Sequence, residues 1–250
     1  MRLRKDRGFA IYLTSPQFKN KVKAIPVIGI LAVRIWRVIK KYRRRKLPKT
    51  NMPEKSAECA PDYSQLSIDE IQRDLDKRYV KGSAYVSTAF WDDVRAEEIN
   101  KQCMDMISPT DGKQILELGC GIGGSAPFIS NCGGYIGTDL SNEAIKTASQ
   151  HFGSKPGFSF IVMDAQEVKF PDCTFDLVIA KEVIEHVPDI KLTLQEAFRV
   201  LKPGGSILIT SPNRNSLHLR INRMLGYEDF TCSFDHIREL TYEEIEQLGK

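Results

Sequence analysis

Short apolar runs alternate with amphipathic segments along most of the chain after residue 110. The runs with the length and composition of strands are residues 114–118, 135–139, 158–163, 175–180 and 206–210. Segments with helical periodicity, such as 142–151 and 191–201, lie between them. This alternation predicts an α/β fold with right-handed crossovers, in which a doubly wound, mostly parallel sheet lies between two layers of helices.

The first strand runs directly into a turn rich in glycine, residues 119–124. Glycines let the backbone pass close to a ligand, and a helix that follows such a turn offers free N–H groups to it. Ser125 and Pro127 are signals for the start of that helix. The pattern predicts a nucleotide site at the carboxyl ends of the strands.

An acid before the turn distinguishes between two kinds of nucleotide. Gly119, Gly121 and Gly124 match the G-x-G-x-x-G spacing of dinucleotide-binding proteins, and Asp139 lies 20 residues beyond Gly119. Glu117, however, would repel a pyrophosphate, whereas it suits a cationic ligand such as the amino end of S-adenosylmethionine. At this point a nicotinamide-dependent enzyme and a plain tight turn remain alternatives.

Residues 111–211 resemble class I S-adenosylmethionine-dependent methyltransferases, whose first motif, acid-x-G-x-G-x-G, is matched by Glu117 and three glycines. The resemblance implies a Rossmann-like fold with S-adenosylmethionine as cofactor. It assigns the ribose hydroxyls to Asp139 and the adenine amino group to Asp164, although a strand-ending Asp seen alone is more often a helix cap. The cofactor-binding residues implied in this way are Glu117, Gly119, Cys120, Gly121, Gly123, Asp139, Leu140, Asp164, Ala165 and Lys181.

His186, which follows the fourth strand, is the candidate general base, and a base is needed only if the methyl acceptor carries a proton. In many members of the family this segment mainly shapes the local fold. Glu182, Glu185 and His186 have the i, i+3, i+4 spacing of one helical face. The segment resembles that of ubiquinone-biosynthesis O-methyltransferases, some of which are thought to use a divalent ion here. A structural helix with solvated carboxylates is the alternative, and we assign no metal.

Charge is distributed very unevenly along the chain. Residues 1–49 contain 16 Lys or Arg and one acid, whereas the remainder contains 20 basic and 31 acidic residues. From residue 27 to 45 the apolar positions fall within about a third of a helical wheel, with Trp36 at their edge. The opposite side carries Arg34, Arg37, Lys40, Lys41 and Arg44. This pattern is typical of a basic amphipathic helix that lies on a membrane surface.

The N-terminal segment does not have the pattern of a membrane span. Its longest uncharged run, residues 24–33, has ten residues, against the ~20 that a transmembrane helix requires. A disordered basic tail, a nucleic-acid-binding tail and a helix packed on its own domain remain alternatives to the membrane surface, with nucleic acid disfavoured. The predicted organisation is a membrane-surface segment at 1–49, a linker at 50–62 and a methyltransferase domain at 63–250.

The last predicted element is a helix, because Thr241 and Glu244 form a capping box. Class I methyltransferases usually continue with two more strands. We therefore expect either a fragment or a sheet that lacks these two strands and ends at five, with an uncovered edge.

Six scattered cysteines without metal-binding spacing predict reduced thiols in the cytoplasm. Together these features predict an enzyme at the inner face of a membrane that methylates a hydroxyl of a lipid-like or lipid-linked small molecule. The alternatives are a soluble small-metabolite methyltransferase, a nicotinamide-dependent oxidoreductase and a non-enzymatic cofactor-binding protein. The identity of the acceptor does not follow from the fold.

Overall fold

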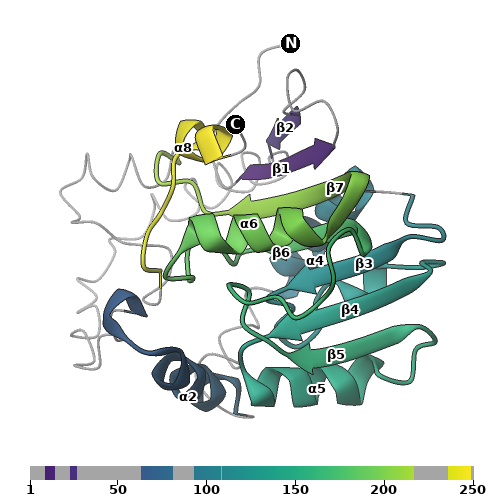
Figure 1. The fold of residues 1–250 in the computed structure, drawn as a ribbon, viewed down its shortest axis with the longest axis horizontal. Coiled ribbons are helices and arrows are strands. Elements are labelled where there is room, and N and C mark those ends of the chain that lie inside the picture. The colour runs from purple at the N-terminus through teal and green to yellow at the C-terminus, as the bar shows by residue number, and fades with distance from the viewer. Residues whose placement is uncertain are drawn as a thin grey trace, which may run out of the picture.

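A computed structural model of the chain describes residues 9–14, 23–26, 63–80, 93–107, 109–216 and 236–248. Within these ranges, a seven-stranded sheet with the spatial order β2-β1-β7-β6-β3-β4-β5 lies at the centre of the molecule (Figure 1). The strands are β1 Phe9–Thr14, β2 Lys23–Pro26, β3 Gln114–Leu118, β4 Gly134–Asp139, β5 Phe158–Val162, β6 Phe175–Lys181 and β7 Leu201–Ser211. Strands β3 to β7 pair in parallel, so the five strands predicted from the sequence are confirmed.

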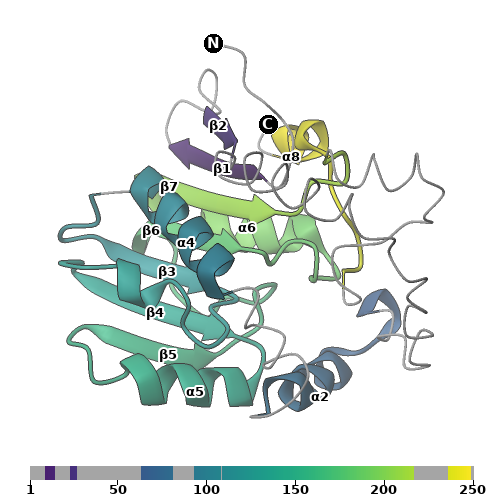
Figure 2. The same cartoon turned by 180° about the vertical axis from the view of Figure 1, so that it is seen from behind.

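Helices cover both faces of this sheet. In chain order the helical elements are η1 Tyr63–Gln65, α2 Ile68–Tyr79, α4 Asp93–Ile107, η3 Ala126–Phe128, α5 Asn142–Phe152, α6 Ile190–Val200 and α8 Tyr242–Leu248. Helix α6 lies in front of β6 and β7 in Figure 1, whereas α4 lies in front of the sheet in the reverse view of Figure 2. The three-layer α/β/α architecture is therefore confirmed.

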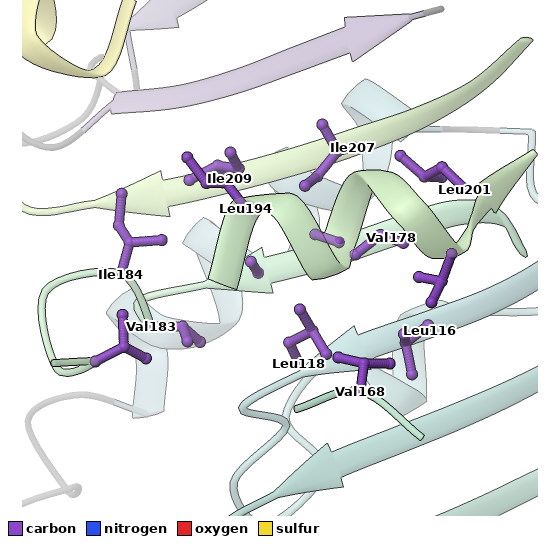
Figure 3. Packing of buried hydrophobic residues seen from close by; sticks show 14 of the residues in the cluster. Leu116, Leu118, Val168, Val178, Val183, Ile184, Leu194, Leu201, Ile207 and Ile209 are labelled. Atoms are coloured by element: carbon purple, nitrogen blue, oxygen red, sulfur yellow. The ribbon is translucent and has the colours of Figure 1, made fainter. Parts of the chain in front are cut away.

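Side chains that alternate along the strands form two cores, one on each face of the sheet. Leu116 and Leu118 of β3 pack toward α6 in a cluster that includes Leu194 of that helix (Figure 3). Ile115 points to the opposite face and packs with Cys103 of α4. Strands buried on both faces have nearly continuous apolar sequences, and the one acid in the middle of β3, Glu117, is therefore an exception that needs an explanation.

Side-chain caps fix the starts of several helices. Ser67 and Glu70 form a capping box at the start of α2, and the Ser141 hydroxyl accepts a hydrogen bond from the Ala144 N–H at the start of α5. The capping box predicted at Thr241 is confirmed, since its N–H donates to Glu244 and its hydroxyl accepts from the Glu244 N–H. These caps fix the residue at which each of these three helices begins.

The edge of the sheet beside β7 differs from the expectation. Strand β1 pairs antiparallel with β7 from Phe9 opposite Ser211 to Thr14 opposite Ser206, and β2 pairs antiparallel with β1. The expectation of a five-stranded sheet with an uncovered edge is therefore wrong, because backbone groups of residues 9–14 pair with those of β7. The amphipathic stretch 27–45 and the linker 50–62 lie outside the described residues, and the domain boundaries stay predictions.

No helix among the described residues combines the length and the apolar character needed to cross a bilayer. The four cysteines described, Cys103, Cys120, Cys132 and Cys173, are all free thiols.

Arg199 of α6 fixes the loop between β5 and β6. Its guanidinium donates to the carbonyl oxygens of Val168 and Phe170 at 2.6 and 2.8 Å. It also pairs with Glu196, whose carboxylate accepts from the Val168 N–H at 3.0 Å. Charge-assisted hydrogen bonds of this kind are strong, and they hold in place the loop that carries Asp164.

Candidate functional site

The residues predicted to bind the cofactor come together at one edge of the sheet. Asp139 ends β4 and Lys181 ends β6, while the glycine turn follows β3 and Asp164 follows β5 by two residues. These four strands are neighbours in the sheet and run in the same direction. Their carboxyl ends therefore lie side by side, at the arrowheads in Figure 1, where open α/β sheets bind ligands.

The glycine turn adopts a backbone that other residues tolerate poorly. Gly119, Gly121 and Gly123 have φ angles of +65°, +53° and +89°, respectively. A Cβ atom on Gly119 would lie 2.4 Å from Val183 Cγ2, and one on Gly123 would lie 2.7 Å from Phe152. Gly124 has no positive φ, and a Cβ there would meet its nearest neighbour at an ordinary 3.6 Å. The turn thus requires glycine at the three positions of the acid-x-G-x-G-x-G spacing.

Glu117 lies beneath this turn and is only 1% exposed. One carboxylate oxygen accepts a 2.6 Å hydrogen bond from the Ser125 hydroxyl, and the other accepts from the Tyr135 hydroxyl. The Thr138 hydroxyl donates to the Glu117 backbone oxygen at 3.0 Å. The residue that follows the turn and strand β4 are therefore both tied to Glu117.

The element after the turn is shorter than expected. Ser125 and Pro127 predicted the start of a helix, but the chain forms a single 3-10 turn, η3, before Ile129 returns to an extended conformation. The Ser125 side chain makes no cap hydrogen bond there, and its hydroxyl donates to Glu117.

Electrostatics at Glu117 reflect competition between burial and nearby donors. Burial raises the pKa of this carboxyl above its ordinary value, while the charge of Lys181 and the two hydroxyl donors act in the opposite direction. The Lys181 ammonium also donates to the Asn100 side chain of α4, whose Nδ2 donates to the Gly124 carbonyl at 3.2 Å. Lys181 thus connects the end of β6 to α4 and the glycine turn.

Asp139 joins the glycine turn to the turn after β4. Its Oδ2 accepts from the Gly121 N–H and its Oδ1 from the Ser141 N–H, both at 2.9 Å. Burial raises the pKa of Asp139, and these backbone donors partly offset the shift. A carboxylate can accept about four hydrogen bonds, so the two donors leave capacity for a pair of hydroxyl groups such as those of a ribose.

The other predicted cofactor residues have distinct surroundings. Asp164 accepts a hydrogen bond from the Gln166 N–H at 2.8 Å, and the neighbouring Ala165 packs against the core. The Leu140 carbonyl accepts from the Gln72 side chain. Cys120 is buried, and burial raises the pKa of its thiol, which makes it a packing residue without thiolate chemistry.

The segment that carries His186 is not the helix that its spacing predicted. Residues 182–186 form a bend and a turn, and Glu182 has a φ of +54° with its carboxylate accepting from the Thr210 hydroxyl at 2.7 Å. The prediction that Glu182, Glu185 and His186 share one face of a helix is therefore wrong. Instead, Glu185, His186 and His236 bring potential metal-ligand atoms within 4.8 Å of one another.

Residues just before α8 pack on this turn. The Ile237 N–H donates to the Glu185 carbonyl at 2.9 Å, and the Arg238 guanidinium donates to the carbonyls of Val187 and Pro188. The rings of His186 and His236 meet edge to face with centroids 4.8 Å apart. No sequence pattern indicated this pairing, because 49 residues separate the two histidines along the chain.

A family model described as a methyltransferase domain matches residues 116–209. The matched range contains the glycine turn, Asp139, Asp164 and Lys181. Residues 116–209 form a methyltransferase domain. S-adenosylmethionine is the cofactor of this class of domain. Gly119, Gly121 and Gly123, which have positive φ angles, lie within the matched range.

The methyltransferase domain is similar to enzymes with different acceptors. The chain is 31% identical to phosphoethanolamine N-methyltransferase 3 of Arabidopsis thaliana over 66% of its own length and 35% of the relative's. It is 38% identical to sterol 24-C-methyltransferase erg6 of Aspergillus fumigatus over 47% of its own length and 34% of the relative's. It is 37% identical to the mitochondrial ubiquinone biosynthesis O-methyltransferase of Bos taurus over 44% of its own length and 31% of the relative's. The chain thus spans about a third of the length of each of these relatives.

Solved structures agree with the fold of the methyltransferase domain. A methyltransferase of Thermotoga maritima, described as a possible histamine N-methyltransferase, superimposes with a TM-score of 0.54 at 22% identity. The match covers 70% of this chain and 78% of that structure. At this identity the likeness shows the α/β architecture alone.

Several residues beside the predicted cofactor site were not expected from the sequence. Gln72, Asp76 and Tyr79 of α2 reach the turns described above, and Asn100 of α4 connects to Lys181. A signal for α2 was present, because Ser67 and Glu70 form the S-x-x-E pattern of a capping box. No sequence pattern indicated where this helix would dock.

We expect Gly119→Ala to lower the free energy of unfolding of the methyltransferase domain by about 1–3 kcal/mol. Alanine is strained at this positive φ, and its Cβ would clash with Val183. Gly124→Ala is the matched control and should change stability by less than about 0.5 kcal/mol. Thermal unfolding and S-adenosylhomocysteine titration of both variants measure the contrast. Equal effects of the two substitutions would contradict the assigned roles of the glycines.

We expect Glu117→Gln to change how stability depends on pH. Because the folded-state pKa of Glu117 is raised above its ordinary value of 4.5, the folded protein binds more protons than the unfolded chain in the window above that value. The contribution of Glu117 to stability is therefore lost as the pH rises through this window. Urea unfolding of the cofactor-free protein from pH 4.5 to 8 should show the variant gaining stability relative to the parent, and a pH-independent difference would contradict this account.

Proposed function

We propose that the chain transfers the methyl group of S-adenosylmethionine to a hydroxyl of a lipid-like or lipid-linked small molecule at the inner, cytoplasmic face of a membrane. The observation that carries the membrane part of the proposal is the charge of residues 1–49, where 16 basic residues accompany one acid. The acceptor class is suggested by relatives named for a sterol and for ubiquinone biosynthesis.

The roles of the residues follow from the positions described above. Asp139 would accept hydrogen bonds from the ribose hydroxyls while the Gly121 and Ser141 N–H groups hold its carboxylate in place. Asp164 would receive the adenine amino group at the end of β5. Hydroxyl donors already bond to both oxygens of the Glu117 carboxylate. Glu117 would therefore attract the cationic end of the cofactor electrostatically from beneath the turn, without a direct hydrogen bond.

Bound S-adenosylmethionine supplies a methyl carbon that is already activated by its sulfonium sulfur. The acceptor oxygen forms a bond to this carbon as the carbon–sulfur bond breaks, and the sulfur keeps the electron pair. The protein contributes mainly by positioning the two reactants and excluding water. The hydroxyl proton must go to a base, and His186, on the turn after β6, is the proposed acceptor of that proton.

The fold also bears on how a membrane segment would be attached. Strand β2 ends at Pro26, and the amphipathic sequence begins at Val27. A segment that binds acidic lipid through residues 27–45 would therefore start from the outer edge of the sheet, beyond β1. The second candidate is a soluble small-metabolite methyltransferase in which the basic segment does not bind lipid, and the relative named for phosphoethanolamine is compatible with it.

Charge substitution tests the membrane surface better than truncation, because deletion of residues 1–49 would also remove β1 and β2 from the sheet. We expect replacement of Arg34, Arg37, Lys40, Lys41 and Arg44 by Gln to weaken binding to vesicles containing phosphatidylserine by at least about a hundredfold, since each basic residue near an acidic surface contributes roughly 1 kcal/mol. Flotation measures the change, and affinity for S-adenosylhomocysteine should stay unchanged. Failure of the parent protein to bind these vesicles would favour the soluble enzyme.

Methyl-labelled S-adenosylmethionine with a membrane lipid extract tests the acceptor class. We expect label in the lipid fraction and a rate about 100- to 10,000-fold lower for His186→Asn, because proton transfer to a positioned base contributes about that much. His151→Asn, on the exposed side of α5, is the matched control and should keep full activity. Label only in water-soluble products would support the second candidate, and an active His186→Asn would remove this histidine from the mechanism.

A further inference from the structure

Helix α2 lies outside the sheet, across the edge at which β3, β4 and β5 end (Figures 1 and 2). Its start is fixed by the Ser67–Glu70 capping box, and the Tyr63 hydroxyl of η1 donates to Asp74 at 2.7 Å. These local contacts support the helix from one side, and its other face is turned toward the ends of the strands.

Three residues on that face reach the turns of the methyltransferase domain. Gln72, Asp76 and Tyr79 have i, i+4, i+7 spacing, which places them in one row along the helix. Gln72 Nε2 donates to the Leu140 carbonyl at 2.8 Å. At the other end of the row, the Tyr79 hydroxyl lies so close to Gly121 that a Cβ atom there would be 3.3 Å away. One helix thus contacts both the turn after β4 and the glycine turn.

Asp76, in the middle of the row, binds the N-terminus of α5. Its Oδ1 accepts from the Ser141 hydroxyl at 2.6 Å and from the Glu143 N–H at 3.2 Å. Its Oδ2 accepts from the Asn142 side chain at 3.1 Å. An anion at this end of a helix meets free N–H groups and the positive end of the dipole. Burial opposes ionisation of Asp76, but these donors prevail and its pKa is lowered.

Ser141 links this contact to the predicted ribose site. Its hydroxyl donates to Asp76, while its backbone N–H donates to Asp139 Oδ1 at 2.9 Å. Asp139 in turn accepts from the Gly121 N–H, next to Tyr79. If α2 moved away, Ser141 would lose a hydrogen bond, and the two turns that hold Asp139 would lose their common support.

We infer that α2 forms one wall of the cofactor site, that its docking is thermodynamically linked to occupancy by S-adenosylmethionine, and that Asp76 is the positioning residue of this link. Asp76 acts through Ser141 and the start of α5, so its role is to hold Asp139 and both turns in the geometry that binds the cofactor. By linkage, a cofactor that binds better when α2 is docked must also stabilise the docked helix. The inference depends on the cofactor alone and is independent of the acceptor and of the membrane.

The test combines binding with hydrogen exchange on the full chain. Calorimetric titration should show that Asp76→Asn and Asp76→Ala bind S-adenosylhomocysteine about tenfold more weakly, the effect expected when a cap and its hydrogen bonds are lost. Asp69→Asn removes the same charge from an exposed position on the same helix and should bind within twofold of the parent. S-adenosylhomocysteine should slow amide exchange at residues 68–79 in the parent and in Asp69→Asn, but not in the Asp76 variants.

A purely structural role for Asp76 would lower the melting temperature and leave the cofactor-dependent protection of residues 68–79 intact, and this result would overturn the inference. Equal affinity of the parent and the Asp76 variants would overturn it as well. A loss of affinity that is large for S-adenosylmethionine but absent for S-adenosylhomocysteine would show a direct charge effect on the sulfonium and contradict a positioning role.

If the Asp76 variants fail to fold, Gln72→Ala replaces them. Its expected loss of affinity is about threefold, because it removes one hydrogen bond to Leu140.

Discussion

The edge of the sheet that carries the glycine turn depends on one buried charge, the carboxylate of Glu117. Removing a carboxylate from water is costly unless donors surround it. In this chain the donors come from different elements, since Tyr135 lies on β4 and Ser125 precedes η3, while the Lys181 ammonium at the end of β6 supplies an opposing charge. The charge can be accommodated only when β4, β6 and the glycine turn are all in place around β3. Satisfying one acid therefore fixes the local arrangement of three neighbouring strands.

Glu117 and Asp139 support the glycine turn from two neighbouring strands. Glu117 supports the turn from inside the sheet, where hydroxyl groups occupy both of its oxygens. Asp139 supports it from the adjacent strand through the Gly121 N–H and keeps part of its hydrogen-bonding capacity. Gly119, Gly121 and Gly123 all have positive φ angles, and the backbone N–H of Gly121 donates to Asp139. Rigid support of this kind is what a reaction that relies on positioning requires.

Much of the fold was visible in the sequence, because both faces of a parallel sheet are covered and its strands are nearly continuous apolar runs. The five strands, the helices between them and the Thr241 capping box follow from such local patterns. The glycine and acid spacing likewise selected residues that the structure brings together at one edge of the sheet, and their role in cofactor binding stays a prediction. The contacts of β1 with β7 and of α2 with α5 could not be predicted in this way, because they join segments far apart in sequence. The turn at 182–186 was misjudged because i, i+3, i+4 spacing does not distinguish a helix from a turn whose first residue has positive φ.

The pairing of β1 with β7 has a consequence for how the protein is made. Phe9 lies opposite Ser211, so β1 cannot pair with β7 until about 200 more residues have been synthesised. During that interval the backbone N–H and C=O groups on the β7-facing edge of β1 have no strand partner and are available to other molecules. Chaperones that bind exposed strand edges would therefore act on this edge of β1 before β7 has been made.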